Sequence, residues 1–135
     1  ELARLRVEVA ESLGRHLSEQ AARRVSWPLL RLSDRGLAVQ AAQHLLRAVG
    51  LTAVPTDGRF DLRTVEAVRR FQTVHRTEEV NGMIGGESWP LLVTAASAVD
   101  SPEVELAARA LSRTDAAPPD TPGEWMRLLD AAARA

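Results

Sequence analysis

Apolar residues recur every three or four positions in several separate stretches of this chain, a spacing that predicts amphipathic helices. The longest stretch covers residues 2–25, and its apolar positions are Leu2, Leu5, Val9, Leu13 and Leu17. Trp27 and Pro28 follow it, and a proline disfavours helix at the residue before it. We therefore expect an N-terminal amphipathic helix whose apolar face packs on this domain or on a neighbouring one.

Two further helices are expected over about 36–49 and 64–75. Asp34 and Thr64 are the predicted N-caps, because short polar side chains accept hydrogen bonds from the free N–H groups of a first turn. Gly50 is the predicted stop of the first helix, since glycine readily adopts the left-handed conformation. The residues expected to be buried are Val39, Ala42, Leu45, Leu46 and Val49 in the first helix and Val65, Val68, Phe71 and Val74 in the second.

The rest of the chain predicts three shorter helices. Ser88 is the expected cap of the first, with Pro90 tolerated in its opening turn. The second begins near Pro102, and a polar loop over 112–120 follows it. The third begins at a capping box formed by Thr121 and Glu124. No long stretch alternates apolar and polar residues as a strand does, so the predicted fold class is all-α.

The composition indicates one domain with a hydrophobic core. The chain has 135 residues, of which 45% are hydrophobic and 26% charged. Aromatic residues make up 4%, so each is expected to anchor the core; they are Trp27, Trp89, Trp125, Phe60 and Phe71. The chain begins with Glu1 instead of Met, and we interpret it as a processed product or a fragment of a longer protein.

Charge and cysteine content argue against several classes of function. The net charge is −1, so the basic excess that a nucleic-acid-binding protein usually has is missing. The absence of cysteine excludes disulfides, thiolate nucleophiles and cysteine-based zinc sites. No apolar run approaches the roughly 20 residues of a membrane span, and no signal peptide is visible.

Residues with catalytic chemistry do not form a recognisable pattern. The three histidines, His16, His44 and His75, are not spaced as metal ligands are. Glu78 and Glu79 are adjacent, and we interpret them as part of a solvated turn and not as an acid/base pair. We therefore expect no catalytic residues, no metal and no cofactor here, and any enzymatic domain would lie outside this chain.

Two short turns bracket the helix expected at 64–75. Each is an acidic or amide residue followed by glycine: Asp57 with Gly58, and Asn81 with Gly82. Glycine permits a positive φ, and the preceding side chain can accept a bond from its own downstream backbone. The residues of this region that we assign to the scaffold are Asp57, Gly58, Phe60, Thr64, Phe71, Gln72, Gly82 and Trp89, with the two Phe between the helices and the Trp closing one end.

A five-residue sequence occurs twice. Ser-Trp-Pro-Leu-Leu stands at 26–30 and again at 88–92, and the segments that follow share apolar positions. We interpret this as a tandem duplication whose second copy has degenerated. The alternative is that two helices of similar amphipathicity look alike.

From Gly36 to Leu92 the sequence resembles the peptidoglycan-binding domain family, small three-helix modules found on bacterial cell-wall hydrolases. The residues that carry the resemblance are Gly36, Val39, Gln43, Leu46, Gly50, Asp57, Gly58, Phe60, Thr64, Ala67, Val68, Phe71, Gln72, Asn81, Gly82, Gly85, Trp89 and Leu92. The resemblance implies an orthogonal three-helix module at 31–95. An N-terminal helix and Trp-Pro linker at 1–30 precede it, and a degenerate second repeat or helical extension at 96–135 follows it.

The resemblance also implies a non-catalytic module that binds peptidoglycan, through its stem peptide or its glycan. We expect a shallow groove between the helices predicted at 36–49 and 64–75 and residues 57–63. The candidate ligand-binding residues are Gln40, Arg59, Asp61, Arg63 and Arg70. The planar arginine fork suits stem-peptide carboxylates, although a solvated face would also place arginines here. The expected location is extracellular or cell-wall associated, with the cytoplasm as the alternative.

A second hypothesis is a protein–protein interaction or scaffolding domain that keeps the fold without binding glycan. Loops that would edge the groove depart from the family pattern, at Asp61 and Leu62, at Asn81 and over residues 76–80. The N-terminal helix over residues 1–25 is then the expected contact with a partner or a neighbouring domain.

Overall fold

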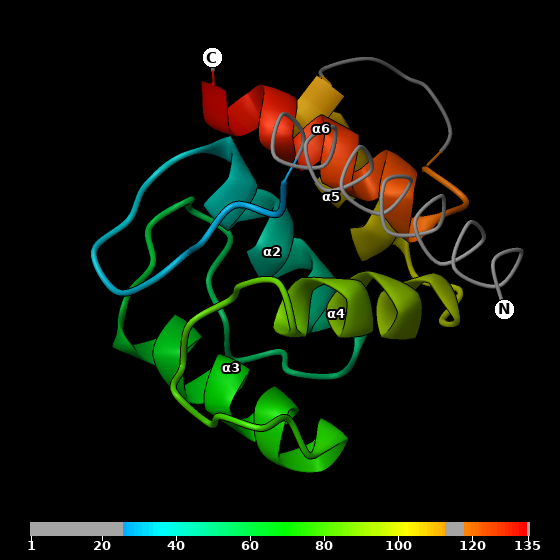
Figure 1. Cartoon of the computed structure of the whole chain (residues 1–135). Helices are drawn as coiled ribbons and strands as arrows, with labels where there is room; N and C mark the ends of the chain where they lie inside the picture. Colours follow the sequence, from blue (N-terminus) through cyan, green and yellow to red (C-terminus); the bar gives the residue numbers. More distant parts are fainter. Residues whose placement is uncertain (1–25, 113–117, 135) are drawn as a thin grey trace, which may run out of the picture.

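The computed structural model describes residues 26–112 and 118–134, and these residues form helices joined by irregular segments (Figure 1). The helices are α2 (Leu37–Ala48), α3 (Leu62–His75), α4 (Ser88–Ser97), α5 (Pro102–Ser112) and α6 (Pro122–Arg134). Within the described residues there are two isolated β-bridges and no strand. The all-α prediction is therefore confirmed, while the helix predicted over 2–25 lies outside the described residues.

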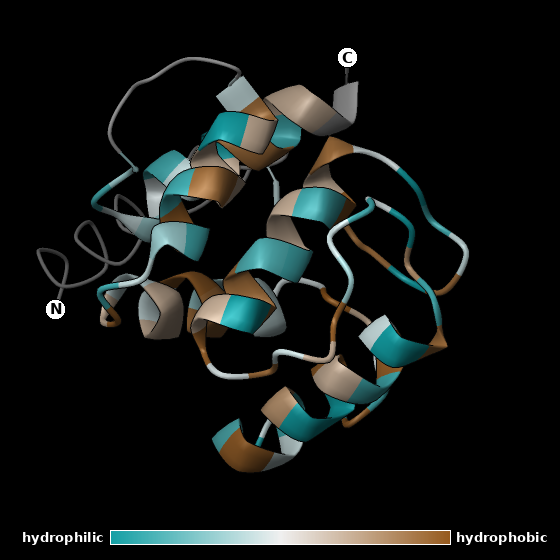
Figure 2. Ribbon diagram, turned by 180° about the vertical axis from the view of Figure 1, so that it is seen from behind, coloured by the Kyte–Doolittle hydropathy of each residue, from teal (hydrophilic) through white to brown (hydrophobic). Residues whose placement is uncertain are grey.

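Helix α2 is the centre of the molecule. It lies between α3 on one side and α5 and α6 on the other (Figure 1), and it packs against every other described helix, most extensively against α5. Eight of its twelve residues are buried. The helices around it carry hydrophilic and hydrophobic residues together (Figure 2), as helices with one face in a core do.

One hydrophobic core runs through all of these helices. The buried residues of α5 and α6 belong to it together with those of α2, α3 and α4. Their members are Val104, Ala107, Ala108, Trp125 and Leu129. The described part of the segment after residue 95 therefore completes the core of the preceding module, and its assignment as a second repeat stays a prediction.

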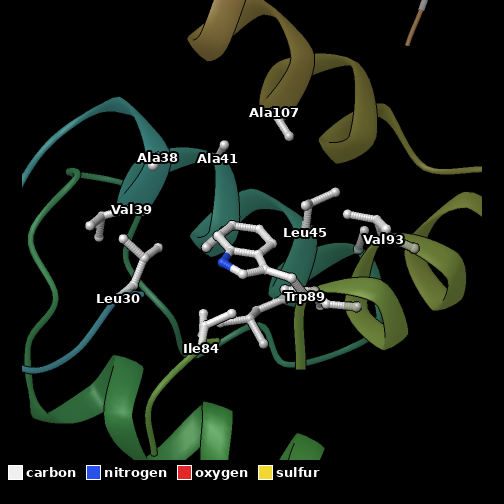
Figure 3. Close-up of a cluster of buried hydrophobic side chains, with 14 of the residues drawn as sticks. Leu30, Ala38, Val39, Ala41, Leu45, Ile84, Trp89, Val93 and Ala107 are labelled. Atoms are coloured by element: carbon white, nitrogen blue, oxygen red, sulfur yellow. The ribbon is translucent and has the colours of Figure 1, made fainter. Parts of the chain in front are cut away.

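Trp89 was expected to close one end of the helices. In the structure it lies inside this core. Its side chain is fully buried and lies among Leu30, Leu45 and Ile84 (Figure 3). The indole Nε1 donates a hydrogen bond of 2.7 Å to a carbonyl oxygen of residue 28. The ring also stacks on Trp27, with centroids 6.0 Å apart and planes 13° apart.

The irregular segment at 26–36, which turns at residues 32–33, forms backbone hydrogen bonds to two loops. Leu30 and Ile84 exchange two backbone hydrogen bonds, of 2.9 and 2.8 Å. Further along, the N–H of Gly36 donates to the carbonyl oxygen of Gly58 at 3.0 Å. The copy of Ser-Trp-Pro-Leu-Leu at 26–30 is not helical, whereas the copy at 88–92 opens α4. The two copies share a sequence without sharing a conformation.

The N-caps of α2 and α3 differ from the predicted ones. The cap of α2 is Gly36, with φ of 138°. The Asp34 carboxylate instead accepts a hydrogen bond from the N–H of Arg31. Asp61 caps α3 and accepts bonds of 3.0 Å from both the N–H and the hydroxyl of Thr64. Thr64 is fully buried, so its hydroxyl serves as a donor inside the helix and not as the cap.

Three other expectations at helix ends have mixed outcomes. Ser88 is the first residue of α4, and Glu87 is the N-cap. The Ser88 hydroxyl does not cap the helix but accepts a hydrogen bond from Gln72. Thr121 does accept a bond from the N–H of Glu124, as predicted for the start of α6. Gly50, with φ of 100°, follows the C-cap of α2 as expected.

Val74 was expected in the core and is 76% exposed. Successive helical residues are about 100° apart, and the buried face of α3 is centred on Val68 and Phe71. Val74 lies to the side of that face, so the hydrophobic period of α3 ends one turn before the helix does.

Candidate functional site

Two buried glutamines hold the turns on which the site is built. The first is Gln43 on α2, whose side chain is fully buried. Its Oε1 accepts a hydrogen bond of 2.9 Å from the N–H of Gly58. Its Nε2 donates to the carbonyl oxygen of Arg59 at 2.8 Å and to the Thr64 hydroxyl at 3.2 Å. This one amide therefore joins α2, the first turn and the start of α3.

Gln72 on α3 does the same for the second turn. Its Oε1 accepts hydrogen bonds of 3.0 Å from the N–H groups of both Asn81 and Gly82. Its Nε2 donates to the carbonyl oxygen of Met83 at 2.8 Å and to the Ser88 hydroxyl at 3.0 Å. The pairing of these buried amides with backbone was not predicted. The available signal was a glutamine within each apolar face, since a buried amide needs partners.

Both turns have the predicted geometry. Asp57 and Asn81 each accept a 3.0 Å hydrogen bond from the N–H two residues later. Gly58 and Gly82 have φ of 76° and 75°. A Cβ on Gly82 would lie 2.7 Å from a methyl carbon of Val65, so this position needs glycine for space as well as for conformation.

A pocket of about 250 Å³ lies between the loop after α2 and the first half of α3. We call it the basic pocket; its lining residues are Gly50, Leu51, Thr52, Ala53, Val54, Arg63, Glu66, Ala67 and Arg70. The groove was predicted beside residues 57–63. In the structure its second wall is the loop at 50–54.

Two of the five candidate ligand-binding residues, Arg63 and Arg70, line the basic pocket. Arg63 pairs with Asp61, with Nη2 and Oδ2 2.9 Å apart. Arg70 pairs with Glu66 across one helical turn at 3.4 Å. The arginine side chains are 66% and 70% exposed, so both guanidinium groups are open to solvent and to a ligand.

Asp61 does not line the pocket, but it pairs with Arg63, which does. Burial raises the pKa of its carboxyl, but the hydrogen bonds from Thr64 and Arg63, with the charge of Arg63, hold the pKa below its ordinary value of 3.8. Asp61 is therefore ionised at neutral pH, as an N-cap of α3 and as a partner of Arg63.

The other two candidates, Gln40 and Arg59, lie outside the pocket lining. Gln40 donates from Nε2 to the carbonyl oxygen of Thr56 at 3.1 Å. Arg59 is exposed and forms a bridge with Arg35 through its backbone. Their role as ligand-binding residues stays a prediction, and the structure does not bring them together with Arg63 and Arg70.

A second pocket, of about 190 Å³, lies beside the Asn81 turn. Three glutamates line it, namely Glu78, Glu79 and Glu87, and we call it the acidic pocket. Glu87 accepts a 2.6 Å hydrogen bond from the N–H of Glu78, which fixes the pocket's outer edge.

The described residues contain neither a cluster of potential metal ligands nor a helix able to span a membrane. Over 26–112 and 118–134, no three histidine or carboxylate side chains gather as metal ligands would. In the same residues, no helix combines the length and the apolar character needed to cross a bilayer.

The helical fold agrees with the comparison with protein families. Residues 35–92 match the family model described as a putative peptidoglycan binding domain. The matched segment covers α2, α3, both turns and the first half of α4. No curated protein and no solved structure matches the chain.

Proposed function

We propose that this chain is a non-catalytic module that holds a larger bacterial protein on the cell wall, since residues 35–92 match the family model of a putative peptidoglycan binding domain. The observation that carries the proposal is the basic pocket, which lies within the matched segment. Its arginines face solvent beside a concave surface, and its ligand is the carboxylate-bearing stem peptide of peptidoglycan. The resulting location is the cell wall.

The arginines of the pocket are able to exchange partners. Exposed ion pairs contribute only about 0–1 kcal/mol, because water and salt screen them. Arg63 and Arg70 are in such pairs, so replacing a neighbouring carboxylate by a ligand carboxylate costs little. A bidentate arginine–carboxylate contact then adds direction as well as attraction.

Charge also selects between the two pockets. The acidic pocket carries three glutamates, which repel the carboxylates of a stem peptide. The basic pocket offers two arginines against one glutamate. An anionic peptide is therefore favoured in the basic pocket over the acidic pocket.

Weak binding is sufficient for this role. The pocket is small and open, and a shallow contact of this kind gives modest affinity by itself. A module tethered to another domain works by raising the local concentration of that domain at the wall, so avidity replaces tight binding.

Sedimentation with purified sacculi tests the proposal. Wild-type chain is expected to be retained above a control protein of similar charge. Arg63→Gln/Arg70→Gln is expected to bind about tenfold more weakly, because two exposed charged contacts of about 0.7 kcal/mol each total about 1.4 kcal/mol. The matched control is Arg31→Gln/Arg69→Gln, which removes two exposed arginine charges that are outside the pocket lining and outside the set of candidate ligand-binding residues.

Each result has a distinct meaning. Retention of the control variant with loss of the pocket variant supports the proposal. Equal loss in both variants means that attraction is only electrostatic and places the ligand elsewhere. No retention of the wild type overturns peptidoglycan binding and leaves the protein-interaction domain as the function to pursue.

A further inference from the structure

A charged cluster joins α5 to α2, and its acidic member lies outside the segment that matches the family. Glu103 is near the start of α5 and approaches two α2 residues with its two carboxylate oxygens. Oε2 lies 2.6 Å from His44 Nδ1, and Oε1 accepts a 3.2 Å hydrogen bond from Arg47 Nε. The Glu103 side chain is 22% exposed and that of His44 is 12% exposed, so this contact is largely removed from water.

The environment of Glu103 favours its charged form. Burial raises the pKa of the carboxyl, but the hydrogen bonds and charges of His44 and Arg47 outweigh burial and hold the pKa below its ordinary value of 4.5. The carboxylate is therefore a fixed anion at neutral pH, facing the Nε edge of the Arg47 guanidinium.

The opposite edge of Arg47 reaches the wall of the basic pocket. Its Nη1 donates hydrogen bonds to the carbonyl oxygens of Thr52, at 2.7 Å, and Val54, at 3.2 Å. Both residues belong to the loop at 50–54 that forms one side of the pocket. A single planar guanidinium thus has one edge on α5 and another on the pocket wall, and its flat fork transmits orientation between them.

We propose that Glu103 is a positioning residue for the basic pocket, acting through Arg47 on the loop at 50–54. Glu103 fixes the plane of the guanidinium, and that plane determines where the two carbonyl groups of the loop are gathered. Helix α5 thereby sets the shape of a pocket that it does not line. The contacts stand independently of the ligand, and only the consequence for binding rests on the proposed function.

The loop has little else to hold it in this shape. Val54 is buried and anchors one end. Between Gly50 and Val54, the backbone hydrogen bonds are the helix-end contacts of residues 50 and 51 and a long bond of 3.5 Å from the Val54 N–H to the carbonyl oxygen of Leu51. Thr52 and Ala53 are exposed, so the two bonds from Arg47 are the main restraint on the middle of the wall.

Backbone amide hydrogen exchange, measured on the whole chain, tests the positioning role without a ligand. Glu103→Gln keeps the side-chain size but removes the charge and places an amide near Arg47. Within residues 50–56, exchange of the hydrogen-bonded amides of Gly50, Leu51 and Val54 is expected to become about tenfold faster, a change of the size associated with losing one charged hydrogen bond. Exchange in the core of α4 is expected to stay as in the wild type.

Two further variants show whether the effect passes through Arg47. Arg47→Lys keeps the charge but loses the fork, and it is expected to give the same local acceleration. The double variant Glu103→Gln/Arg47→Lys is expected to show no additional effect, because residues acting through one another are not additive. The matched control is Glu105→Gln, which removes an exposed charge from the same helix and is expected to leave residues 50–56 unchanged.

Sacculus binding by the same variants connects the loop to function. Glu103→Gln is expected to weaken retention severalfold, with Glu105→Gln at the wild-type level. If Glu103→Gln leaves exchange at 50–56 unchanged, or accelerates exchange equally throughout α4, the positioning role is wrong. If exchange changes locally while sacculus affinity does not, the link to the pocket is wrong. If even the wild type fails to bind sacculi, the proposed function falls, and exchange alone decides the positioning role.

Discussion

Substitution of Gln72 would leave buried backbone N–H groups without an acceptor, whereas substitution of Gln40 would not. Gln72 is 2% exposed and its Oε1 is the acceptor for the N–H groups of Asn81 and Gly82. Gln40 makes one bond, to a carbonyl oxygen at the edge of a loop. Removing the Gln72 amide therefore strands backbone donors inside the protein, which removing the Gln40 amide does not.

Gln72→Met is expected to lower the free energy of unfolding by about 2–4 kcal/mol, because each buried unsatisfied group costs roughly 1–3 kcal/mol. Gln40→Met, a substitution of the same size and chemistry on α2, is the control and is expected to cost less than about 1 kcal/mol. Urea denaturation followed by circular dichroism measures both. Equal losses would show that the side-chain volume matters and the amide bonds do not.

Two fully buried tryptophans give a second comparison at the residue scale. Trp89 donates its indole N–H to the carbonyl oxygen of residue 28 and stacks on Trp27. Trp125 is equally buried, at 1% exposure, but its indole nitrogen has no hydrogen-bond partner among the described residues. A ring without the N–H should therefore be tolerated better at residue 125.

Trp89→Phe is expected to cost about 2–3 kcal/mol, since it leaves a cavity and removes a hydrogen bond. Trp125→Phe is expected to cost about 1 kcal/mol less, because relief of an unsatisfied buried group offsets part of the cavity. Thermal and urea unfolding of the two variants provide the comparison. A larger loss for Trp125→Phe would point to a partner for its indole outside the described residues.

At the scale of elements, α3 depends on an ionised cap. The pKa of Asp61 is lowered on folding, so its contribution to stability is present above its unfolded value of 3.8 and is lost as the pH falls through the lower folded pKa. Asn is also a good cap but does not titrate. The two side chains therefore separate the hydrogen bond from the charge.

Asp61→Ala is expected to cost about 1 kcal/mol near neutral pH. The stability difference between the wild type and Asp61→Asn is expected to shrink as the pH falls from about 6 to about 2, where the aspartate becomes neutral. Unfolding curves at a series of pH values measure this. Asp57→Asn, the same substitution in a turn, is the control, and a parallel decline in both variants would contradict the assignment.

The elements could be predicted from sequence more reliably than their ends. Helices α2, α3 and α5 follow from apolar spacing because packing on one face requires that spacing. The caps predicted at Asp34 and Ser88 were wrong because a short polar residue has several possible hydrogen-bond partners. The Asp34 carboxylate accepts a bond from Arg31, and the Ser88 hydroxyl accepts one from Gln72. Local sequence does not say which partner the fold will bring near.

Likewise, only part of the candidate site could be predicted from the sequence. Arg63 and Arg70 are seven residues apart, so two helical turns place them on one face, and sequence alone identified them. The opposite wall at 50–54 could not be predicted, because its shape depends on Arg47 and, through it, on Glu103 of a distant helix. Contacts between residues 56 positions apart leave no local pattern.

At the scale of the whole molecule, the folding unit extends beyond the segment that matches the family. The match ends at residue 92, yet Ala107 and Trp125 are buried in the same core as α2. Removing α5 and α6 would therefore expose the central helix along the face that packs most extensively.

A chain that ends at residue 97 is expected to lose more than about 5 kcal/mol of stability, comparable to the whole stability of a small domain, and to lack a cooperative unfolding transition. Ala107→Asp is expected to reproduce much of this loss by burying an unpaired charge. Leu106→Asp, on the exposed face of the same helix, is the control. A folded, cooperative chain of residues 26–97 would show that the family segment is independent.

The central place of α2 has a consequence for synthesis of the protein on the ribosome. Among the described helices, α2 is made first, and its most extensive partner, α5, is completed only at residue 112. The face of α2 that packs on α5 therefore lacks this partner while more than sixty further residues are translated, which at about 5–20 residues per second takes several seconds. During that interval this apolar face is open to non-native contacts, and slower translation before α5 would prolong the exposure.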